Sequence, residues 1–273
     1  MKLVVSPQAH LPLASSSFWP PKYYLRNTTS TSRFRFFCSL NDQSESEPIG
    51  ITESDNSRPK YRPGILDDLF LDLFRNRMVH EVGWDSEKPG YDGLIEVANR
   101  LMMRRSNSET KEAAVRILRA LFPPLLLELY RLLIAPLQKG KVAAIMVARV
   151  TALSCQWLMG PCAVNNVDLP DGSSLRSGVF VERCKYLEES KCVGICLNTC
   201  KLPTQTFFKD YMGVPLWMEP NFSDYSCQFK FGVLPPWPED DNALKEPCLE
   251  ICPNARRRRE FASSVDLLSC PKA

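Results

Sequence analysis

Apolar positions recur every three or four residues through the first half of the folded sequence, and this pattern predicts amphipathic helices. Three are predicted, at about residues 65–78, 92–102 and 108–121. Ser108 can cap the third, because a serine hydroxyl accepts a hydrogen bond from an unpaired N–H of the first turn. The Pro123-Pro124 pair ends this helix, since proline is tolerated in the first turn of a helix but not in its interior.

Two later segments, 125–137 and 142–158, are apolar on nearly every side. Neither is a convincing membrane span. Glu128 and Arg131 interrupt the first, and Arg149 lies near the middle of the second, where a charge costs about 2.5–3.5 kcal/mol on insertion scales. A helix that is apolar all round must be covered by something. We expect both segments in the core, with an apolar ligand groove as the alternative.

The composition of the chain changes at Gly160-Pro161, after which proline, glycine and cysteine become frequent. Short strands are predicted at about 179–181, 216–218 and 228–231. The expected fold class is therefore α+β, with a mainly helical N-terminal half packed on a smaller cysteine-rich half with short strands. The boundaries are expected at 64–160 for the helical region and 161–273 for the cysteine-rich region, with 64–260 forming one domain.

The first forty residues carry no acidic side chain but many serines, threonines and arginines, which is typical of an organellar transit peptide. We expect residues 1–40 to be a plastid transit peptide that is cleaved near Cys38, and 41–63 to be a solvated, disordered linker. The remainder carries 29 basic and 31 acidic residues, so its charge argues against a nucleic-acid partner. Arg256–Arg259 can bind phosphate or anionic lipid, although a solvated helix face is the simpler interpretation.

The chain contains eleven cysteines but only two histidines, and this ratio favours sulfur chemistry over imidazole chemistry. Cys192, Cys196 and Cys200 have helical i, i+4, i+8 spacing, which predicts three thiols on one face. Three interpretations stay open. Disulfides need an oxidising compartment, and zinc favours C-x2-C pairs that are missing here. An iron or iron–sulfur site suits a thiolate set with few histidines.

The run 181–205, followed by 212–216 and 219–222, resembles the plant Dwarf-twenty-seven family, the plastid β-carotene isomerases that start strigolactone biosynthesis. The similarity covers about residues 61–252. It implies an iron-containing isomerase of the chloroplast, in the stroma or peripheral to plastid membranes. Such an enzyme interconverts all-trans-β-carotene and 9-cis-β-carotene and hands the product to a carotenoid cleavage dioxygenase. It also makes an apolar substrate groove along 125–137 and 142–158 a reasonable hypothesis.

The metal ligands expected from this resemblance are all cysteines, with three at the centre and others completing the set: Cys192, Cys196, Cys200, Cys184, Cys227, Cys248 and Cys252. Whether the iron is mononuclear or part of an iron–sulfur cluster is left open. Such a centre can exchange one electron with a polyene and recover it, which weakens a double bond transiently. Two alternatives remain: a non-enzymatic plastid iron–sulfur electron carrier or structural metal protein, and a paralogous isomerase that acts on another carotenoid.

Overall fold

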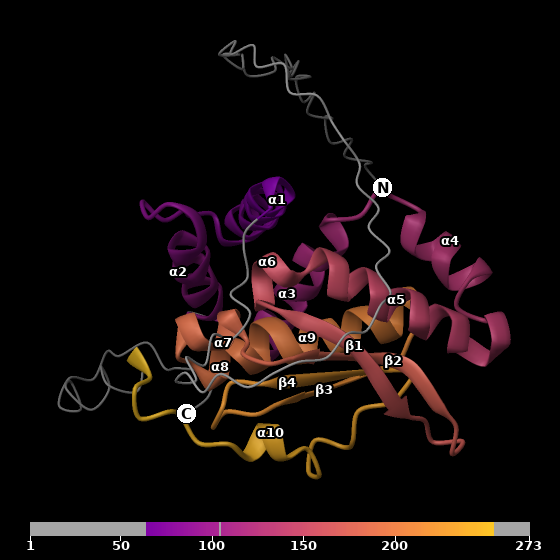
Figure 1. Cartoon of the computed structure of the whole chain (residues 1–273). Helices are drawn as coiled ribbons and strands as arrows, with labels where there is room; N and C mark the ends of the chain where they lie inside the picture. The colour runs from indigo at the N-terminus through magenta and orange to yellow at the C-terminus, as the bar shows by residue number, and fades with distance from the viewer. Residues whose placement is uncertain (1–63, 104, 254–273) are drawn as a thin grey trace, which may run out of the picture. The chain divides into compact units, whose positions relative to one another are not determined.

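The first three helices pack together through the apolar positions that predict them (Figure 1). The structure is a computed structural model that describes residues 64–103 and 105–253. The expected transit peptide, the linker and Arg256–Arg259 lie outside these residues. The helices are α1 (Ile65–Val82), α2 (Gly90–Met102) and α3 (Asn107–Ala120). They meet in a core that includes Met78, Leu94, Leu101 and Ile117.

The capping residue of α3 differs from the prediction. Ser106 caps this helix, and Ser108 lies inside its first turn. The Ser106 Oγ accepts from the Glu109 N–H at 3.3 Å, and the Ser106 N–H donates to the Glu109 carboxylate at 2.7 Å. Both partners of the capping box are satisfied only when the serine stands three residues before the glutamate, which selects Ser106.

The two segments that are apolar on every side form four short elements: α4 (Leu126–Leu133), the 3-10 turn η1 (Leu137–Gly140), α5 (Lys141–Ser154) and α6 (Gln156–Met159). The expectation that both lie in the core is correct for one side of α5, where Ala144 and Ala148 are buried. It is wrong for α4, which contains no buried residue. Its inward side packs through Leu127 and Tyr130, while its other leucines are exposed.

Four antiparallel strands form one sheet in the order β1-β2-β4-β3. They are β1 (Cys162–Asp168), β2 (Ser174–Val181), β3 (Leu216–Pro220) and β4 (Cys227–Phe231). The three predicted strands are confirmed as parts of β2, β3 and β4. β1 was not predicted, because Asn165 and Asn166 break its apolar pattern. The observed class is α+β, as expected.

Only one face of the sheet belongs to the core. The register places Val179, Phe229 and Met218 side by side across three strands, and all three are buried. The opposite face carries polar side chains such as Gln228 and Lys230. This alternation is typical of an antiparallel sheet that packs on one side. α5 lies against β2 on the buried side, where its alanines allow close approach.

The cysteine-rich part adds helices to the same core (Figure 1). After β2 the chain forms α7 (Lys185–Ser190) and then one unbroken helical run. This run consists of α8 (Val193–Ile195), the π-helical segment η2 (Cys196–Lys201), α9 (Leu202–Thr206) and a second π-helical segment, η3 (Phe207–Tyr211). The last element is α10 (Asn242–Lys245), on the loop that follows β4.

The described residues all fall within one compact unit, Asp55–Ala273. None of the helices in the described part of the chain combines the length and apolar character needed to cross a membrane.

Gly178 lets two amide side chains meet across the middle strand of the sheet. Asn165 on β1 and Gln228 on β4 exchange hydrogen bonds of 2.7 and 3.1 Å over β2. A Cβ on Gly178 would stand 2.1 Å from the Asn165 Oδ1 and 2.6 Å from a Val167 methyl carbon. The position therefore requires glycine because of close approach.

We expect Gly178→Ala to lower the free energy of unfolding by about 1–3 kcal/mol, because the methyl group overpacks this contact. Urea unfolding followed by circular dichroism measures the change. Adding Asn165→Ala removes the shortest of these contacts, the one with the amide oxygen, so the double variant should lose less than the two single losses combined. Strict additivity would contradict the explanation, and Ser174→Ala at the exposed start of β2 is the control.

Candidate functional site: a thiol-lined apolar cavity

An enclosed cavity of about 180 Å³ lies between the long helical run and the buried face of the sheet. Helices α3, α5, α6 and α7 close its other sides. Its walls are mostly apolar, and they are formed by Leu118, Leu121, Phe122, Thr151, Cys155, Leu158, Met159, Cys184, Tyr186, Leu187, Cys196, Cys200, Lys201, Thr204, Phe207, Phe208, Met218, Pro220, Cys227 and Phe229. A site of this character suits an apolar group far better than a charged metabolite.

Five thiols from four parts of the chain face this cavity. Cys196 and Cys200 come from η2, Cys184 precedes α7, Cys227 opens β4, and Cys155 lies at the break between α5 and α6. None of the five is in a disulfide. Four of them belong to the predicted ligand set. Cys155 does not, because nothing in the local sequence distinguishes it from a core cysteine.

The other three predicted ligands lie elsewhere. Cys192 is the N-cap of α8 and packs with the core of the first three helices, as Cys252 does. Cys248 stands on the C-terminal loop. The prediction that Cys192, Cys196 and Cys200 share one helix face is wrong for Cys192, because the helix begins only at Val193.

Burial keeps these thiols in the neutral form. It raises the pKa of Cys196 and of Cys227 well above the usual range, and the neighbouring thiols raise both further. Burial has the same effect on the pKa of Cys200, again reinforced by the thiols beside it. The Lys201 ammonium opposes the shift at Cys196 and Cys227.

Lys201 is the one cation among the side chains that line the cavity, and it is 0% exposed. Its ammonium pairs with the Asp241 carboxylate, which lies at the start of α10 and is 6% exposed. An unpaired buried charge costs several kcal/mol, so the pair is obligatory for both partners. Sequence reasoning missed both residues, because forty positions separate them and neither belongs to a recognisable motif.

Hydrogen bonds from two tyrosines hold the helices around the cavity. The Tyr186 hydroxyl lies 2.8 Å from the Thr199 hydroxyl, which donates to the Ile195 carbonyl. The Tyr91 hydroxyl donates to the Leu158 carbonyl at 2.6 Å and so ties α2 to α6. Burial raises the pKa of both phenols above their usual range. They therefore act as neutral hydrogen-bonding groups.

The predicted groove along the two apolar segments is only partly present. Segment 125–137 contributes no residue to the cavity, and segment 142–158 contributes Thr151, Cys155 and Leu158. Instead, Phe122 connects the cavity to a neighbouring open groove, because its ring lines both. It stacks on Phe207 with ring centroids 5.5 Å apart.

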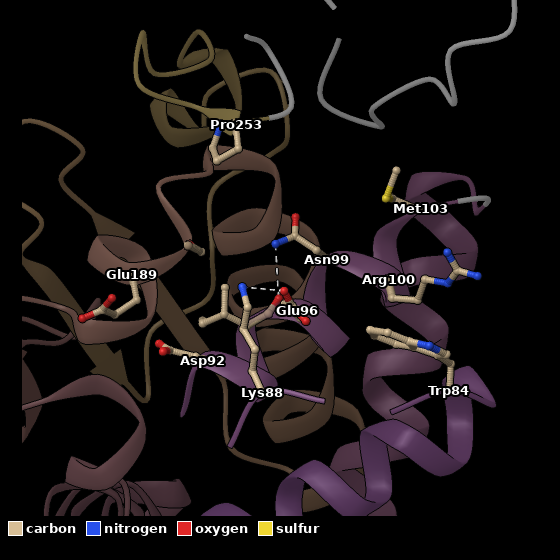
Figure 2. Close-up of a pocket in the computed structure, with 11 residues that line it drawn as sticks. Trp84, Lys88, Asp92, Glu96, Asn99, Arg100, Met103, Glu189 and Pro253 are labelled. Atoms are coloured by element: carbon tan, nitrogen blue, oxygen red, sulfur yellow. Dashed lines mark hydrogen bonds and ion pairs between the residues drawn. The ribbon is translucent and has the colours of Figure 1, made fainter. Parts of the chain in front are cut away.

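A larger open pocket of about 630 Å³ lies between α2 and the Glu189-Ser190 end of α7 (Figure 2). Five of its lining side chains are charged, and Lys88 and Glu96 among them form an ion pair. Figure 2 shows Lys88 reaching Glu96, at 2.6 Å, and Arg100 lying against Trp84. Its charged lining suits a hydrocarbon less well than the walls of the thiol-lined cavity do. His80 is exposed in the last turn of α1 and lines none of these pockets.

The cavity contains donor atoms of a type that binds metals, but these atoms are not arranged to hold a metal ion. Thiolates are ligands that iron and iron–sulfur clusters accept. However, among the residues that the structure describes, no group of three or more His, Cys, Asp or Glu side chains stands close enough to hold a metal ion. The thiols are also protonated, for the reasons given above. The observed arrangement is therefore not a preformed metal centre.

The described part of the chain is an α+β domain with an apolar cavity that five thiols line. Residues 157–240 match the family model for the C-terminal region of D27-like β-carotene isomerases. This stretch contains the four strands, the long helical run and four of the five cavity thiols.

Two curated plant proteins are similar over a longer stretch. The chloroplastic β-carotene isomerase D27 of Medicago truncatula is 33% identical over 192 residues, which cover 70% of this chain and 75% of that protein. The chloroplastic β-carotene isomerase D27 of Arabidopsis thaliana is 36% identical over 167 residues, which cover 61% of this chain and 62% of that protein. No solved structure matches the chain. The chain belongs to the D27-like β-carotene isomerase family.

The raised pKa values predict that the metal-free fold loses stability in alkali. The unfolded thiols ionise above their ordinary pKa of 9.0, whereas the folded thiols keep their protons. The free energy of unfolding should therefore fall as pH rises above about 9, by at most about 1.4 kcal/mol per pH unit for each such thiol. Thermal unfolding in chelator across alkaline pH measures this slope. The Cys196→Ala/Cys227→Ala variant should show a shallower slope, and an equal slope would contradict the assignment.

The Lys201–Asp241 pair predicts strong coupling between two distant substitutions. Lys201→Met leaves a buried carboxylate without its cation and should cost about 3–5 kcal/mol of unfolding free energy. Adding Asp241→Asn removes that charge while keeping the oxygen that accepts the Ala243 N–H, so most of the loss should be recovered. Urea unfolding of both variants is the measurement. A double variant as unstable as Lys201→Met would refute the coupling.

Proposed function

We propose that this protein is a plastid isomerase that interconverts all-trans-β-carotene and 9-cis-β-carotene, the first step of strigolactone biosynthesis. The observation that carries the proposal is the largely enclosed apolar cavity with thiols on its wall, four of whose five thiols lie in the stretch that matches the family model. The names of the two plant relatives, which are chloroplastic β-carotene isomerases, support the substrate and the compartment. A carotenoid cleavage dioxygenase is the proposed recipient of the product.

The cavity suits a reaction that needs shielding rather than a co-substrate. An isomerisation makes and breaks no bond in the net reaction and consumes no water. Excluding water protects a reactive state of the polyene from side reactions. Leu118, Phe207 and Met218 supply apolar contacts, and neutral thiols add sulfur without the cost of a buried charge.

The cavity volume limits how the substrate is held. At about 180 Å³ it lies below the range of about 300–1,000 Å³ that encloses a drug-sized ligand. It therefore accommodates one stretch of the polyene, with the remainder outside. Phe122 is 36% exposed and lines both the cavity and the open groove, so we place the access route there.

The proposal includes iron, and its only support is the chemistry of the donor atoms. Cys184, Cys196, Cys200 and Cys227 face one cavity and are the residues that we propose to bind it. Binding there would require these thiols to lose their protons and to move closer together, and iron would then supply reversible one-electron chemistry. The predicted ligands Cys192, Cys248 and Cys252 lie outside the cavity wall and have less support.

Cavity thiols and thiols elsewhere should behave differently when they are replaced. We expect Cys196→Ser and Cys200→Ser to lower isomer formation by about tenfold or more. Substituting residues that merely contact the ligands of a metal already costs about tenfold or more in metal affinity or activity. Cys162→Ser, a partly buried thiol on β1 outside the cavity, should retain activity. Anaerobically purified protein is incubated with all-trans-β-carotene, and the isomers are resolved chromatographically.

Iron and sulfide are measured on the same samples, with circular dichroism to confirm folding. Isomer formation without iron would remove the metal from the proposal. Iron without isomer formation in the native protein would instead favour an electron carrier. Full activity in folded Cys196→Ser and Cys200→Ser would refute the role of the cavity thiols.

A further inference from the structure

The region around α4 and α5 exposes an unusual number of large apolar side chains. Every leucine of α4 except Leu127 is 47–67% exposed, and Leu153 on α5 is 82% exposed. We call this surface the leucine face, which consists of Leu126, Leu129, Leu132, Leu133, Leu137, Met146, Val150 and Leu153. Clustered apolar exposure of this kind marks an interaction site rather than ordinary surface.

Packing of the opposite side of α4 keeps the α4 part of the leucine face exposed to solvent. The opposite side of α4 packs Leu127 and Tyr130 against the main core, and the Tyr130 hydroxyl donates to the Ala143 carbonyl of α5 at 3.2 Å. α4 is therefore anchored through one apolar side while it presents the other to solvent.

Positive charge surrounds this face. Residues 113–167 contain six basic side chains and a single carboxylate, Glu128. The other residues between 64 and 253 contain fifteen basic and twenty-three acidic side chains, so the charge is strongly segregated. Within the described part of the chain, Lys139 and Arg149 form no ion pair. Arg116, Arg119 and Arg131 line the open groove beside α4, together with Glu128 and Asp210. Arg116 is paired with Glu81, and Lys141 with Asp171.

We infer that the leucine face docks on the surface of an anionic phospholipid bilayer. Exposed leucines enter the acyl boundary, and the surrounding cations meet the lipid phosphates, as in other interfacial helices. Arg149 lies between apolar neighbours, where a long stem can extend its charge to the headgroups. A second copy is a poorer partner, because a two-fold interface would bring two surfaces with the same excess of positive charge together. The inference does not depend on the proposed isomerase activity.

Vesicle binding of the full chain tests this. Binding to phosphatidylcholine vesicles with and without phosphatidylglycerol is measured by co-sedimentation, and hydrogen exchange locates the protected amides. We expect tighter binding to the anionic vesicles and slower exchange within 125–153. Leu132→Glu/Leu133→Glu and Leu153→Glu should each weaken binding by at least about tenfold. Lys139→Glu and Arg149→Glu should each weaken it by about fivefold or more, on anionic vesicles only.

Leu234→Glu is the matched control, since Leu234 is similarly exposed but lies outside the leucine face. It should bind as the native chain does. Unchanged affinity in both leucine variants, or protection confined to other segments, would overturn the inference. So would a stable dimer that the leucine substitutions dissociate, together with a lack of vesicle binding. Carotenoid turnover is not read in this experiment, so its result is independent of the isomerase test.

Discussion

Contact between the apolar face of the four-stranded sheet and the helices above it organises the described part of the protein. The sheet offers only one such face, so α5 and the run from α8 to η3 must share it. The alanines of α5 bring that helix close to β2, while Phe207 and Phe208 of η3 pack near Phe231 of β4. The cavity is the space that these differently sized side chains leave between them.

The wall of this cavity combines groups of very different solvation cost. Neutral thiols are tolerated in apolar surroundings, whereas an ammonium there requires a counter-ion. Lys201 meets this requirement with Asp241, which ties the C-terminal loop to the helix that carries Cys196 and Cys200. The fold thus places a fixed positive charge beside polarisable sulfur without opening the cavity to water.

Much of the fold could be predicted from the sequence, because helix periodicity and strand alternation report burial directly. The first three helices and parts of three strands follow from these patterns. β1 was not predicted because two consecutive asparagines interrupt its alternating pattern, and one of them, Asn165, forms the amide contact over Gly178. α4 was assigned to the core because periodicity shows that a side chain is apolar but not what covers it.

The site was only partly predictable, for a related reason. Spacing located the cysteine segment but assumed one regular α-helix from Cys192 to Cys200. The helix in fact begins at Val193 and continues in π-helical geometry. Cys155, Lys201 and Asp241 reach the cavity through long-range packing, which no local pattern reports.

The two π-helical segments also bear on how the family can change in length. A π turn closes its hydrogen bonds over five residues instead of four, so it accommodates one residue more than an α-helical turn. Loss of a single residue between Cys196 and Cys200 could restore regular α-helix without interrupting the helical run. The two cysteines would then stand three residues apart, a spacing that also keeps both side chains on one face of an α-helix. A homologue that is shorter by one residue here could thus keep both the fold and the shared orientation of these two thiols.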